Sequence, residues 1–324
     1  MPEKITISDF HLEKGTEKNN MQLTYQIFGP PLHSAPVILV NHALTGNSNV
    51  TGENGWWNQI IGKNKAIDTS VFTVIAFNIP GNGYDENPDN FQHDYKNGTA
   101  KDIAKLFWSG LSFLKVNQLF AVIGGSLGGG IAWEMAAVQP HRVQNLIPIA
   151  THWKATDWVI GNVLIQDQIL NNSSNPIHDA RLHAMFLYRT PESINQKFEK
   201  KTDKSAVDFQ VENWLLHHGT KLKKRFSLPP YKLMNHLLKT IDITKNSNIE
   251  TEIQNITANM HIIAVDSDLF FTARENQLTH EKLHAIKSNL FYHEIKSIHG
   301  HDAFLIEFQQ LTEILKPIFH THKN

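Results

Sequence analysis

Short apolar runs and amphipathic stretches alternate along the first half of the chain. The apolar runs, which predict strands, lie at residues 23–28, 37–40, 72–77, 119–123 and 146–150. Between the last three of these runs, apolar residues recur at helical spacing over residues 99–116 and 131–138. Runs that are apolar throughout are typical of buried strands, and strands that alternate with helices predict a mostly parallel sheet with helices on both faces.

Helical spacing with hardly any strand is typical of the middle of the chain. The helical segments lie at residues 156–170, 179–188 and 211–219, and Pro229-Pro230 is predicted to break the run. The α/β pattern then returns, with strands at residues 260–265 and 290–295 and helices at residues 275–286 and 303–318.

We therefore divide the chain into a core, formed by residues 1–152 and 256–324, and a helical insertion of residues 153–255. The insertion is too regular for a linker and too long for an ordinary loop. Above the carboxyl edge of the sheet it would form a lid. An independent helical domain is the alternative.

Composition and charge exclude several classes of function. Lys and Arg number 30 against 31 Asp and Glu, a net charge of −1, which gives no basic surface for nucleic acid or for an anionic membrane. The chain has no cysteine, so a cysteine nucleophile and thiolate metal sites are excluded. The first twenty residues lack the apolar core of a signal peptide, and no run approaches the roughly 20 apolar residues of a membrane span. We expect a cytoplasmic protein that binds neither nucleic acid nor membrane.

Histidine is unusually frequent, with 19 residues, but its spacing does not indicate a metal site. His217 and His218 are adjacent, and adjacent residues on a helix do not share a face. We therefore predict no bound metal ion.

The segment Gly124-Gly125-Ser126-Leu127-Gly128 matches the pattern G-x-S-x-G and lies between a predicted strand and a predicted helix. This is the position of a nucleophile elbow, a sharp turn that lifts a serine hydroxyl above the sheet. Side chains two residues before and after the serine would collide, which explains Gly124 and Gly128. The turn also aims the N–H group of Leu127 at a developing oxyanion. A glycine-rich structural turn is the alternative.

A serine nucleophile needs a histidine base and a carboxylate that orients the base. Candidates occur in an order found in one group of serine hydrolases, namely Ser, then Asp or Glu, then His. Asp266 and Asp268 follow the predicted strand at residues 260–265, and His299 and His301 lie between the last strand and the last helix. Spacing alone does not decide between the two aspartates or between the two histidines.

A second donor to the oxyanion is expected from a loop that follows an early strand. The run at residues 37–40 is followed by Asn41-His42-Ala43-Leu44-Thr45-Gly46, in which the Leu44 N–H group is the candidate. A structural turn with a buried His42 is the alternative.

These motifs together resemble the homoserine O-acetyltransferase family, whose members are acyltransferases of the α/β-hydrolase fold. The matching segments are Asn41-His42-Ala43-Leu44-Thr45-Gly46, Gly55-Trp56-Trp57, Lys65-Ala66-Ile67-Asp68-Thr69, Gly124-Gly125-Ser126-Leu127-Gly128-Gly129, Ser267-Asp268-Leu269-Phe270-Phe271 and Gly300-His301-Asp302-Ala303-Phe304-Leu305. The resemblance implies an α/β-hydrolase fold in which Ser126 is the nucleophile, Asp268 orients the base, and His301 is the base.

The resemblance also gives the lid a purpose. In the family, an arginine and a tyrosine seven residues later reach the substrate from a lid helix, and Arg181 and Tyr188 match that pattern. Residues seven apart are close to two helical turns apart and share one face. Asp302 matches the position that holds the substrate's amino group. The alternatives are a surface ion pair for Arg181 and a cap of the last helix for Asp302.

The activity implied is transfer of an acetyl group from acetyl-CoA to the hydroxyl of L-homoserine through an acyl-serine, a step of methionine biosynthesis. We expect acetyl-CoA as a co-substrate, no permanently bound cofactor, and a homodimer formed through the lid helices. The chain departs from the family at Ile79-Pro80-Gly81-Asn82-Gly83-Tyr84 and at Gly130-Ile131-Ala132-Trp133, which bears on the choice of acyl donor. The alternatives are a serine esterase or thioesterase, a relative that uses succinyl-CoA or serine, and a catalytically silent binding protein.

Overall fold

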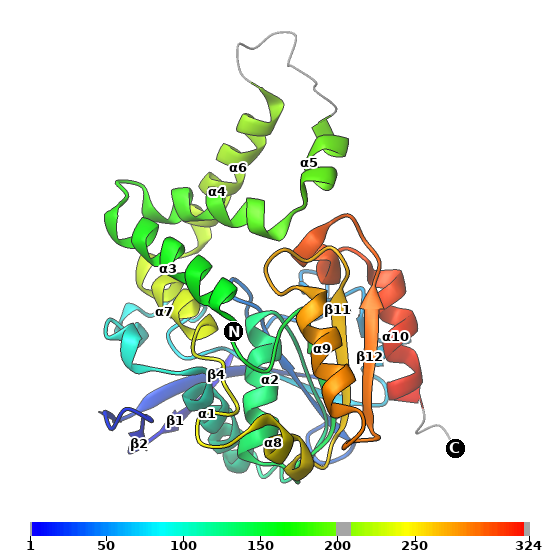
Figure 1. The fold of residues 1–324 in the computed structure, drawn as a ribbon. Coiled ribbons are helices and arrows are strands. Elements are labelled where there is room, and N and C mark those ends of the chain that lie inside the picture. Colours follow the sequence, from blue (N-terminus) through cyan, green and yellow to red (C-terminus); the bar gives the residue numbers. More distant parts are fainter. Residues whose placement is uncertain (1, 199–208, 321–324) are drawn as a thin grey trace.

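The computed structural model of the protein describes residues 2–198 and 209–320 (Figure 1). Within these residues, eight strands form one sheet in the order β1-β4-β8-β5-β9-β10-β11-β12. They are β1 (Glu3–Ile7), β4 (Met21–Phe28), β8 (Thr73–Phe77), β5 (Val37–Asn41), β9 (Leu119–Gly125), β10 (Val143–Ile149), β11 (Asn259–Val265) and β12 (Leu290–Ile295). Two small pairs lie outside this sheet, β2 (Phe10–His11) with β3 (Glu17–Lys18) and β6 (Ile61–Gly62) with β7 (Ile67–Asp68).

The sheet is mostly parallel, as the sequence predicts. Strands β8, β5, β9, β10, β11 and β12 pair in parallel, whereas β4 is antiparallel to both of its neighbours, β1 and β8. The sequence pattern does not reveal β1, because this edge strand buries only Ile5. Parallel strands end at the same edge of a sheet, so the loops after β5, β9, β11 and β12 are brought together there.

Helices cover both faces of the sheet. On one face lie α1 (Ala100–Phe113), α2 (Leu127–Val138) and α9 (Ala273–Leu283), and on the other lies α10 (Phe308–His320). An irregular segment over residues 48–72, which buries Trp57 and Phe72, completes the second face. Among the described residues, no helix is both long enough and apolar enough to cross a membrane.

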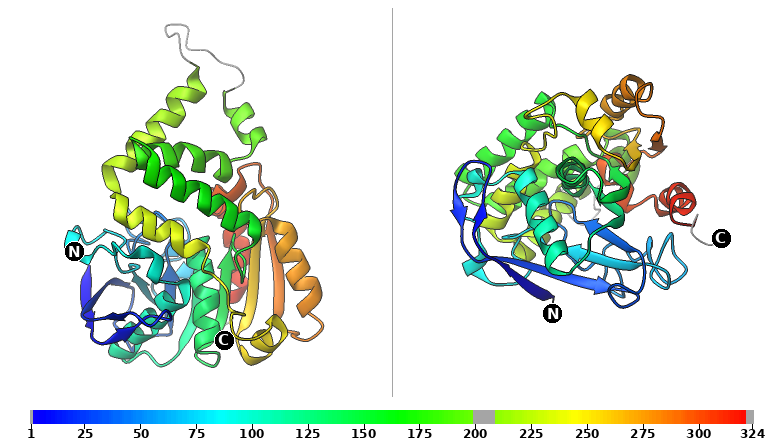
Figure 2. Two further views of the ribbon diagram at one scale, coloured as in Figure 1. Left: turned by 60° about the vertical axis from the view of Figure 1, so that its left-hand side comes forward. Right: turned by 90° about the horizontal axis from the view of Figure 1, so that it is seen from below.

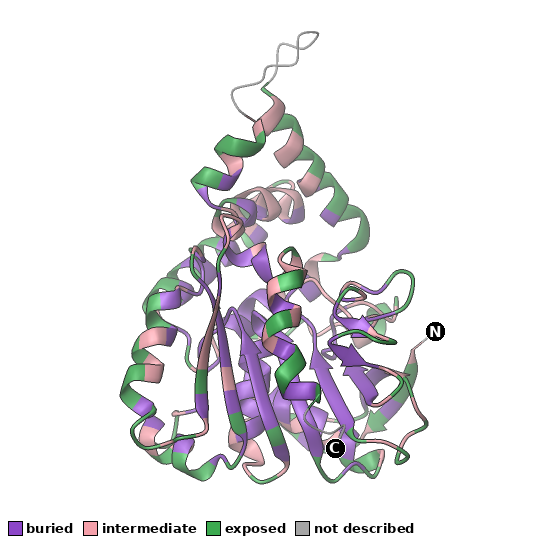
Figure 3. Ribbon diagram, turned by 90° about the vertical axis from the view of Figure 1, so that its right-hand side faces the viewer, coloured by how far each residue is buried: buried purple, intermediate pink, exposed green. Residues whose placement is uncertain are grey.

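The apolar side chains form two clusters, one on each side of the sheet. The central strands β8, β5 and β9, which are buried throughout, lie between them (Figure 3). Strand β5 shows the division, because Leu39 packs in the cluster beneath α1 and α2, whereas Ile38 and Val40 pack in the cluster beneath α10. All five residues of β5 are buried. Burial on both faces explains why the strand reads as an uninterrupted apolar run.

The described residues between β10 and β11 form helices and no strand of the sheet. The helices are α3 (Asp157–Asn172), α4 (Pro176–Tyr188), α5 (Pro191–Phe198), α6 (Gln210–Arg225), α7 (Leu228–Leu238) and α8 (Ile249–Asn255). Helices α3 to α6 rise above the carboxyl edge of the parallel strands, whereas α8 lies at the opposite edge (Figures 1 and 2). The helical run is interrupted between α6 and α7, and Pro229 and Pro230 stand in the first turn of α7, where a missing N–H group costs little.

The last helix begins later than the sequence pattern predicts. Residues Gly300–Leu305 form a 3-10 helix, η3, and α10 starts at Phe308. The earlier 3-10 turns, η1 (Pro88–Asn90) and η2 (Tyr95–Asn97), lie in the segment between β8 and α1.

Candidate active site

Ser126 occupies the sharp turn between β9 and α2. Its backbone has a φ of +56° and a ψ of −124°, a combination that residues with a side chain rarely adopt. A Cβ atom on Gly124 would come within 2.5 Å of the backbone of Gly128, and one on Gly128 would come within 2.4 Å of the Asn41 carbonyl oxygen. The turn therefore requires glycine at both positions, and it has the strained strand-to-helix geometry of a nucleophile elbow.

Three side chains from different loops meet at this turn. The Nε2 atom of His301 lies 2.9 Å from Ser126 Oγ, and its Nδ1 atom lies 2.7 Å from Asp268 Oδ2. The three residues follow β9, β11 and β12, and their exposed fractions are only 5% for Ser126, 4% for Asp268 and 3% for His301. A proton can pass from Ser126 to His301 while Asp268 accepts a hydrogen bond from Nδ1, which is the geometry of a Ser–His–Asp triad.

The backbone holds the carboxylate of Asp268 in place. Its Oδ1 atom accepts hydrogen bonds from the N–H groups of Phe270 and Phe271, at 2.7 and 2.9 Å. Burial alone would lower the pKa of His301, but the charge of Asp268 and its hydrogen bond outweigh burial and raise the pKa above its usual value. The imidazole is therefore a stronger base toward the Ser126 hydroxyl than an exposed histidine.

The two rival residues lie elsewhere. Asp266 is exposed, and its Oδ1 atom accepts a hydrogen bond from the Ser297 N–H group at 3.0 Å. The Nδ1 atom of His299 lies 3.0 Å from Ser193 Oγ and 3.2 Å from Arg189 Nη2. The geometry therefore brings Asp268 and His301 to the serine, which is the pair that the resemblance implies.

The N–H groups of Leu44 and Leu127 lie in two backbone segments that flank the nucleophile. Leu127 is the first residue of α2, and Leu44 follows β5, which pairs with β9 through Asn41 and Gly124. Within the described residues, neither N–H group has a hydrogen-bond acceptor. Two free N–H groups beside a nucleophile can receive an oxyanion.

The helices α3 to α6 above the carboxyl edge of the sheet, which we call the lid, contribute a cation and an aromatic ring. Tyr188, the last residue of α4, packs against His301 with their ring centroids 5.3 Å apart. The Arg181 guanidinium lies 5.8 Å from the centre of the Tyr188 ring. Burial raises the pKa of Asp302, and the nearby positive charge of Arg181 acts against that rise. The Arg181 guanidinium and the Asp302 carboxyl therefore both lie beside the triad, close enough for their charges to interact.

Neither of the simpler interpretations of Arg181 and Asp302 fits this arrangement. Asp302 lies in η3, and α10 begins only at Phe308, so Asp302 does not cap the last helix. Within the described residues Arg181 has no surface ion pair, and its ring contact is with Tyr188.

Sequence reasoning did not find two further arginines at the site. The Nη1 atom of Arg189 lies 3.9 Å from Asp302 Oδ2, and its Nη2 atom donates to Ser193 Oγ at 3.0 Å. Arg225, the last residue of α6, donates from Nη1 to the Thr45 carbonyl oxygen at 2.9 Å. An arginine at the end of a helix gives no signal of its target in the sequence. The position of Arg189 directly after Tyr188 is the one hint that the chain offers.

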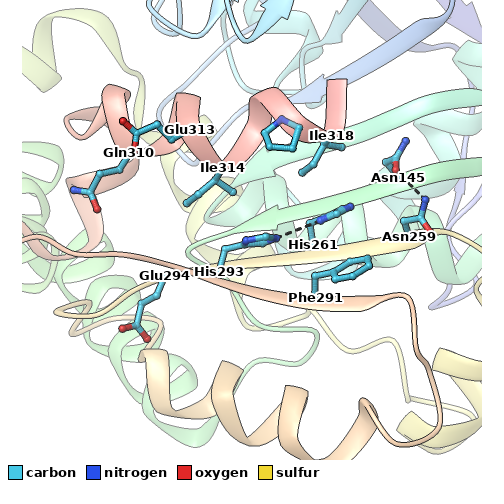
Figure 4. Close-up of a pocket in the computed structure, with 11 residues that line it drawn as sticks. Asn145, Asn259, His261, Phe291, His293, Glu294, Gln310, Glu313, Ile314 and Ile318 are labelled. Carbon is cyan, nitrogen blue, oxygen red and sulfur yellow. Dashed lines mark hydrogen bonds between the residues drawn. The ribbon is translucent and has the colours of Figure 1, made fainter. Parts of the chain in front are cut away.

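A groove of about 660 Å³ lies away from this site, between α10 and the strands β11 and β12 (Figure 4). The ring of His261 stacks between those of Phe291 and His293 on its floor, and no triad residue lines it. Within the described residues, no group of three or more His, Asp or Glu side chains is arranged to hold a metal ion.

Comparison with known proteins assigns the fold to a class. Residues 36–227 match the family described as the alpha/beta hydrolase fold. The crystal structure of esterase E22 has a TM-score of 0.87 at 21% identity, over 98% of this chain and 100% of that one. The homoserine O-acetyltransferase of Bacillus anthracis also has a TM-score of 0.87, at 19% identity, over 98% of this chain and 97% of that one. The protein therefore belongs to the class of proteins with the α/β-hydrolase fold, as predicted.

Sequence comparison narrows the class further. The homoserine O-acetyltransferase of Cyclobacterium marinum is 31% identical over 330 residues, which cover 95% of this chain and 92% of that protein. This chain belongs to the homoserine O-acetyltransferase family, as its motifs imply. Membership makes it an acyltransferase of the α/β-hydrolase fold.

Proposed function

We propose that the protein transfers an acetyl group from acetyl-CoA to the hydroxyl group of L-homoserine, through an acyl-serine on Ser126. Acetyl-CoA acts as a co-substrate rather than as a bound cofactor. The observation that carries the proposal is the presence of two opposite charges beside a hydrogen-bonded Ser–His–Asp set. Arg181 lies against the Tyr188 ring that packs on His301, and Asp302 directly follows His301. A guanidinium suits the carboxylate of an amino acid, and a carboxylate suits its ammonium group. A plain esterase has no need for that pair.

In the first half-reaction, His301 takes the proton of Ser126 while Oγ attacks the thioester carbonyl. The 2.9 Å between Nε2 and Oγ gives the proton a direct path. The N–H groups of Leu44 and Leu127 stabilise the oxyanion, and each such donor is worth about 3 kcal/mol. The tetrahedral intermediate then expels CoA, whose sulfur takes the proton from His301, and the acetyl group stays on Ser126.

In the second half-reaction, His301 removes the proton of the homoserine hydroxyl, which attacks the acetyl-serine ester. Asp268 accepts a hydrogen bond from Nδ1 and stabilises the imidazolium that forms. Arg181 and Asp302 bind the two charged ends of the amino acid and so direct its hydroxyl to the ester carbonyl. Collapse of the second intermediate returns the proton to Ser126 and releases acetylhomoserine.

Water is the competing acceptor, and hydrolysis would make the same triad an esterase or a thioesterase. Transfer exceeds hydrolysis when homoserine is held in line with the ester and water is not. The charged pair on the lid and η3 can hold homoserine, whereas it adds nothing to the binding of water. We therefore favour transfer over hydrolysis.

A matrix of donors and acceptors tests the proposal. Acetyl-CoA and succinyl-CoA are each supplied with homoserine, serine or water, and the products are separated by mass. Acetylhomoserine is expected to form faster than any other product, and homoserine is expected to suppress the release of free acetate. Free acid released at the same rate with and without homoserine would instead show a thioesterase. A faster reaction with succinyl-CoA or serine would reassign the donor or the acceptor.

We also propose a homodimer formed through the lid helices and a cytoplasmic reaction, where acyl-CoA and methionine biosynthesis are found. Large apolar side chains on the lid support the dimer, since Phe186 on α4 is 52% exposed and Leu216 on α6 is 48% exposed. Light scattering should give the mass of two chains, and Leu216→Glu should give the mass of one. The control is Phe113→Glu, a change of an exposed residue on α1 outside the lid. A monomeric wild-type protein would contradict the dimer.

A further inference from the structure

His42 is a buried histidine in the loop that follows β5, two residues before Leu44. Its exposed fraction is 1%. Its Nδ1 atom lies 2.8 Å from the carbonyl oxygen of Ala43. Its Nε2 atom lies 3.0 Å from the backbone nitrogen of Ile79 and 3.3 Å from Asn82 Nδ2. The ring therefore links the loop after β5 to the loop after β8.

These partners determine where the ring proton sits. The N–H group of Ile79 can only donate, so Nε2 of His42 accepts and carries no proton. The proton is therefore on Nδ1, which donates to the Ala43 carbonyl oxygen. Burial lowers the pKa of His42 to about 4, which keeps the ring neutral near neutral pH.

The hydrogen bond from His42 fixes the orientation of the peptide group between Ala43 and Leu44. The Ala43 carbonyl oxygen also accepts a hydrogen bond from the Gly46 N–H group at 2.9 Å, so two donors hold it. No described peptide bond is cis, and in a trans peptide the C=O and N–H groups point in opposite directions. The Leu44 N–H group is therefore turned away from both donors.

The same loop lies directly against the nucleophile elbow. A Cβ atom on Gly128 would lie 2.4 Å from the Asn41 carbonyl oxygen and 2.7 Å from that of His42. Asn41 Nδ2 donates to the Gly128 carbonyl oxygen at 3.3 Å. If the peptide between Ala43 and Leu44 rotated by half a turn, a carbonyl oxygen would replace the N–H group. A negative partial charge would then face the oxyanion. The orientation of this peptide group therefore determines whether the loop stabilises or destabilises the oxyanion.

We propose that His42 is a positioning residue, which keeps the Leu44 N–H group directed at the oxyanion by donating from Nδ1 to the Ala43 carbonyl oxygen. The proposal rests on the acyl-serine chemistry proposed above. The sequence offered a Leu44 donor and a structural turn with a buried His42 as alternatives. Under this proposal both hold, because the buried His42 orients the Leu44 N–H group.

The loop after β8 helps to hold the His42 ring. Asn82 contacts both Nε2 of His42 and Asn78 Oδ1, each at 3.3 Å, and Asn78 Oδ1 also accepts the Ser48 N–H group at 2.8 Å. A chain of buried polar groups thus connects the residues after Asn78, where the sequence departs from its family, to the oxyanion loop.

Two substitutions of His42 separate its two hydrogen-bonding atoms. In His42→Asn, the amide nitrogen takes the place of Nδ1 and can still donate to Ala43, while the acceptor at Nε2 is lost. In His42→Gln, the amide oxygen reaches the place of Nε2 and can still accept from Ile79, while the donor to Ala43 is lost. The rate measured is acylation of Ser126 by p-nitrophenyl acetate, which requires the triad and the oxyanion donors but neither CoA nor homoserine.

His42→Gln is expected to be acylated about 10- to 100-fold more slowly than wild type at an unchanged KM, since removing an oxyanion donor outright costs about 100- to 1000-fold. His42→Asn is expected to stay within about threefold of wild type, because the Leu44 donor is retained. His42→Asn loses the acceptor for Ile79 and Asn82, and His42→Gln loses the donor to Ala43. Tm is therefore expected to fall in both variants, and at least as far in His42→Asn, so a lower stability would not explain a slower His42→Gln. Equal acylation rates in the two variants, or a slower His42→Asn, would overturn the proposal.

A matched pair at another buried histidine serves as the control. His236 on α7 is 6% exposed and packs against Tyr95, away from the oxyanion loop. His236→Asn and His236→Gln are expected to be acylated at the same rate as each other. A difference between these two as large as that between the His42 variants would show that the comparison reports packing, and would overturn the proposal.

Further outcomes separate this proposal from the proposed function. Acylation without any acetylhomoserine would remove homoserine as acceptor and leave the His42 comparison intact, whereas a wild-type enzyme that the ester does not acylate overturns both. If neither His42 variant folds, the tautomer of His42 in the wild-type protein decides, read from the nitrogen chemical shifts of the ring. A proton on Nδ1 is expected, and a proton on Nε2 would overturn the proposal.

Discussion

Replacing Asp268 with asparagine should leave the fold intact and remove nearly all turnover. The carboxylate uses both oxygens, since Oδ1 accepts the N–H groups of Phe270 and Phe271 and Oδ2 lies 2.7 Å from His301 Nδ1. In the variant, the amide oxygen has to stay at the Oδ1 position, because two N–H groups point there. The amide NH₂ group then faces His301 Nδ1, which must accept a hydrogen bond instead of donating one.

The consequence is the wrong tautomer of the base. With Nδ1 as acceptor, Nε2 of His301 carries the proton and cannot take a second one from Ser126, 2.9 Å away. In another Ser–His–Asp triad in which this substitution has been measured, turnover fell about 10⁴-fold. That factor corresponds to about 5.5 kcal/mol of activation free energy. We expect a loss of the same order here.

Steady-state acetyl transfer measures the loss, and Asp266→Asn is the matched control. Asp266 is exposed, and within the described residues its side chain accepts a hydrogen bond only from the Ser297 N–H group, so its variant should stay within about twofold of wild type. A loss in Asp266→Asn comparable with that in Asp268→Asn would refute the assignment of the carboxylate.

The pH profile gives a second readout. Burial lowers the pKa of His301, but Asp268 raises it above the usual value, so wild-type activity should fall as the pH drops through this raised pKa. A general base must be neutral, and the asparagine variant lacks the charge that holds the proton. Its acid limb should therefore lie at lower pH than that of wild type, and an unchanged acid limb would contradict the reasoning.

Four further predictions follow from the site. Acetyl-CoA alone should add the mass of one acetyl group to wild type and none to a folded Ser126→Ala; an equal gain in the variant would show that the nucleophile is another residue. His301→Ala should lose far more turnover than His299→Ala, and equal losses would remove the reason for choosing His301. Arg181→Leu should keep the pre-steady-state burst of CoA and raise the KM for homoserine about 10- to 100-fold, which corresponds to the loss of one ionic hydrogen bond. Arg181→Lys should recover only part of the lost homoserine binding. Unchanged homoserine kinetics would instead favour the hydrolase. Burial lowers the pKa of His42 to about 4, so the unfolded chain binds more protons below pH 6.5, and the free energy of unfolding should decline as the pH falls from 6.5 to about 4. His42 should contribute up to about 3 kcal/mol of that decline. Urea titrations at each pH should show a shallower decline in a folded His42→Asn.

The strands beside the site are the part of the fold that sequence predicts best. Parallel strands covered on both faces must be apolar throughout, so β5 and β9 read as continuous runs. Strand β1 buries only Ile5 and offers no such pattern. Helix α7 is not predicted for another reason. Pro229 and Pro230 indicate a break in a helix unless they are known to stand in its first turn.

The sequence predicts the positions of the candidate catalytic residues, but it does not predict the directions of their side chains. The spacing around Ser126 predicts a nucleophile elbow, because a sharp turn imposes glycine at fixed positions. Asp266 and Asp268 both follow β11, and nothing in their spacing says which one turns toward the sheet edge. The bond from Arg225 to the Thr45 carbonyl oxygen joins residues 180 positions apart, so no local pattern could have revealed it.

The lid holds the catalytic loops as well as the residues expected to bind homoserine. Arg225 donates to Thr45, directly after Leu44, and Thr190 Oγ1 donates to the Ile298 carbonyl oxygen in the loop of His301. These contacts tie α6 to the oxyanion loop and the end of α4 to the loop of the base. A displacement of the lid would therefore disturb the oxyanion donor and the base along with Arg181. The same set of helices thus contacts the catalytic loops and carries Arg181. Under the proposed function, this arrangement favours transfer to a bound amino acid over attack by water.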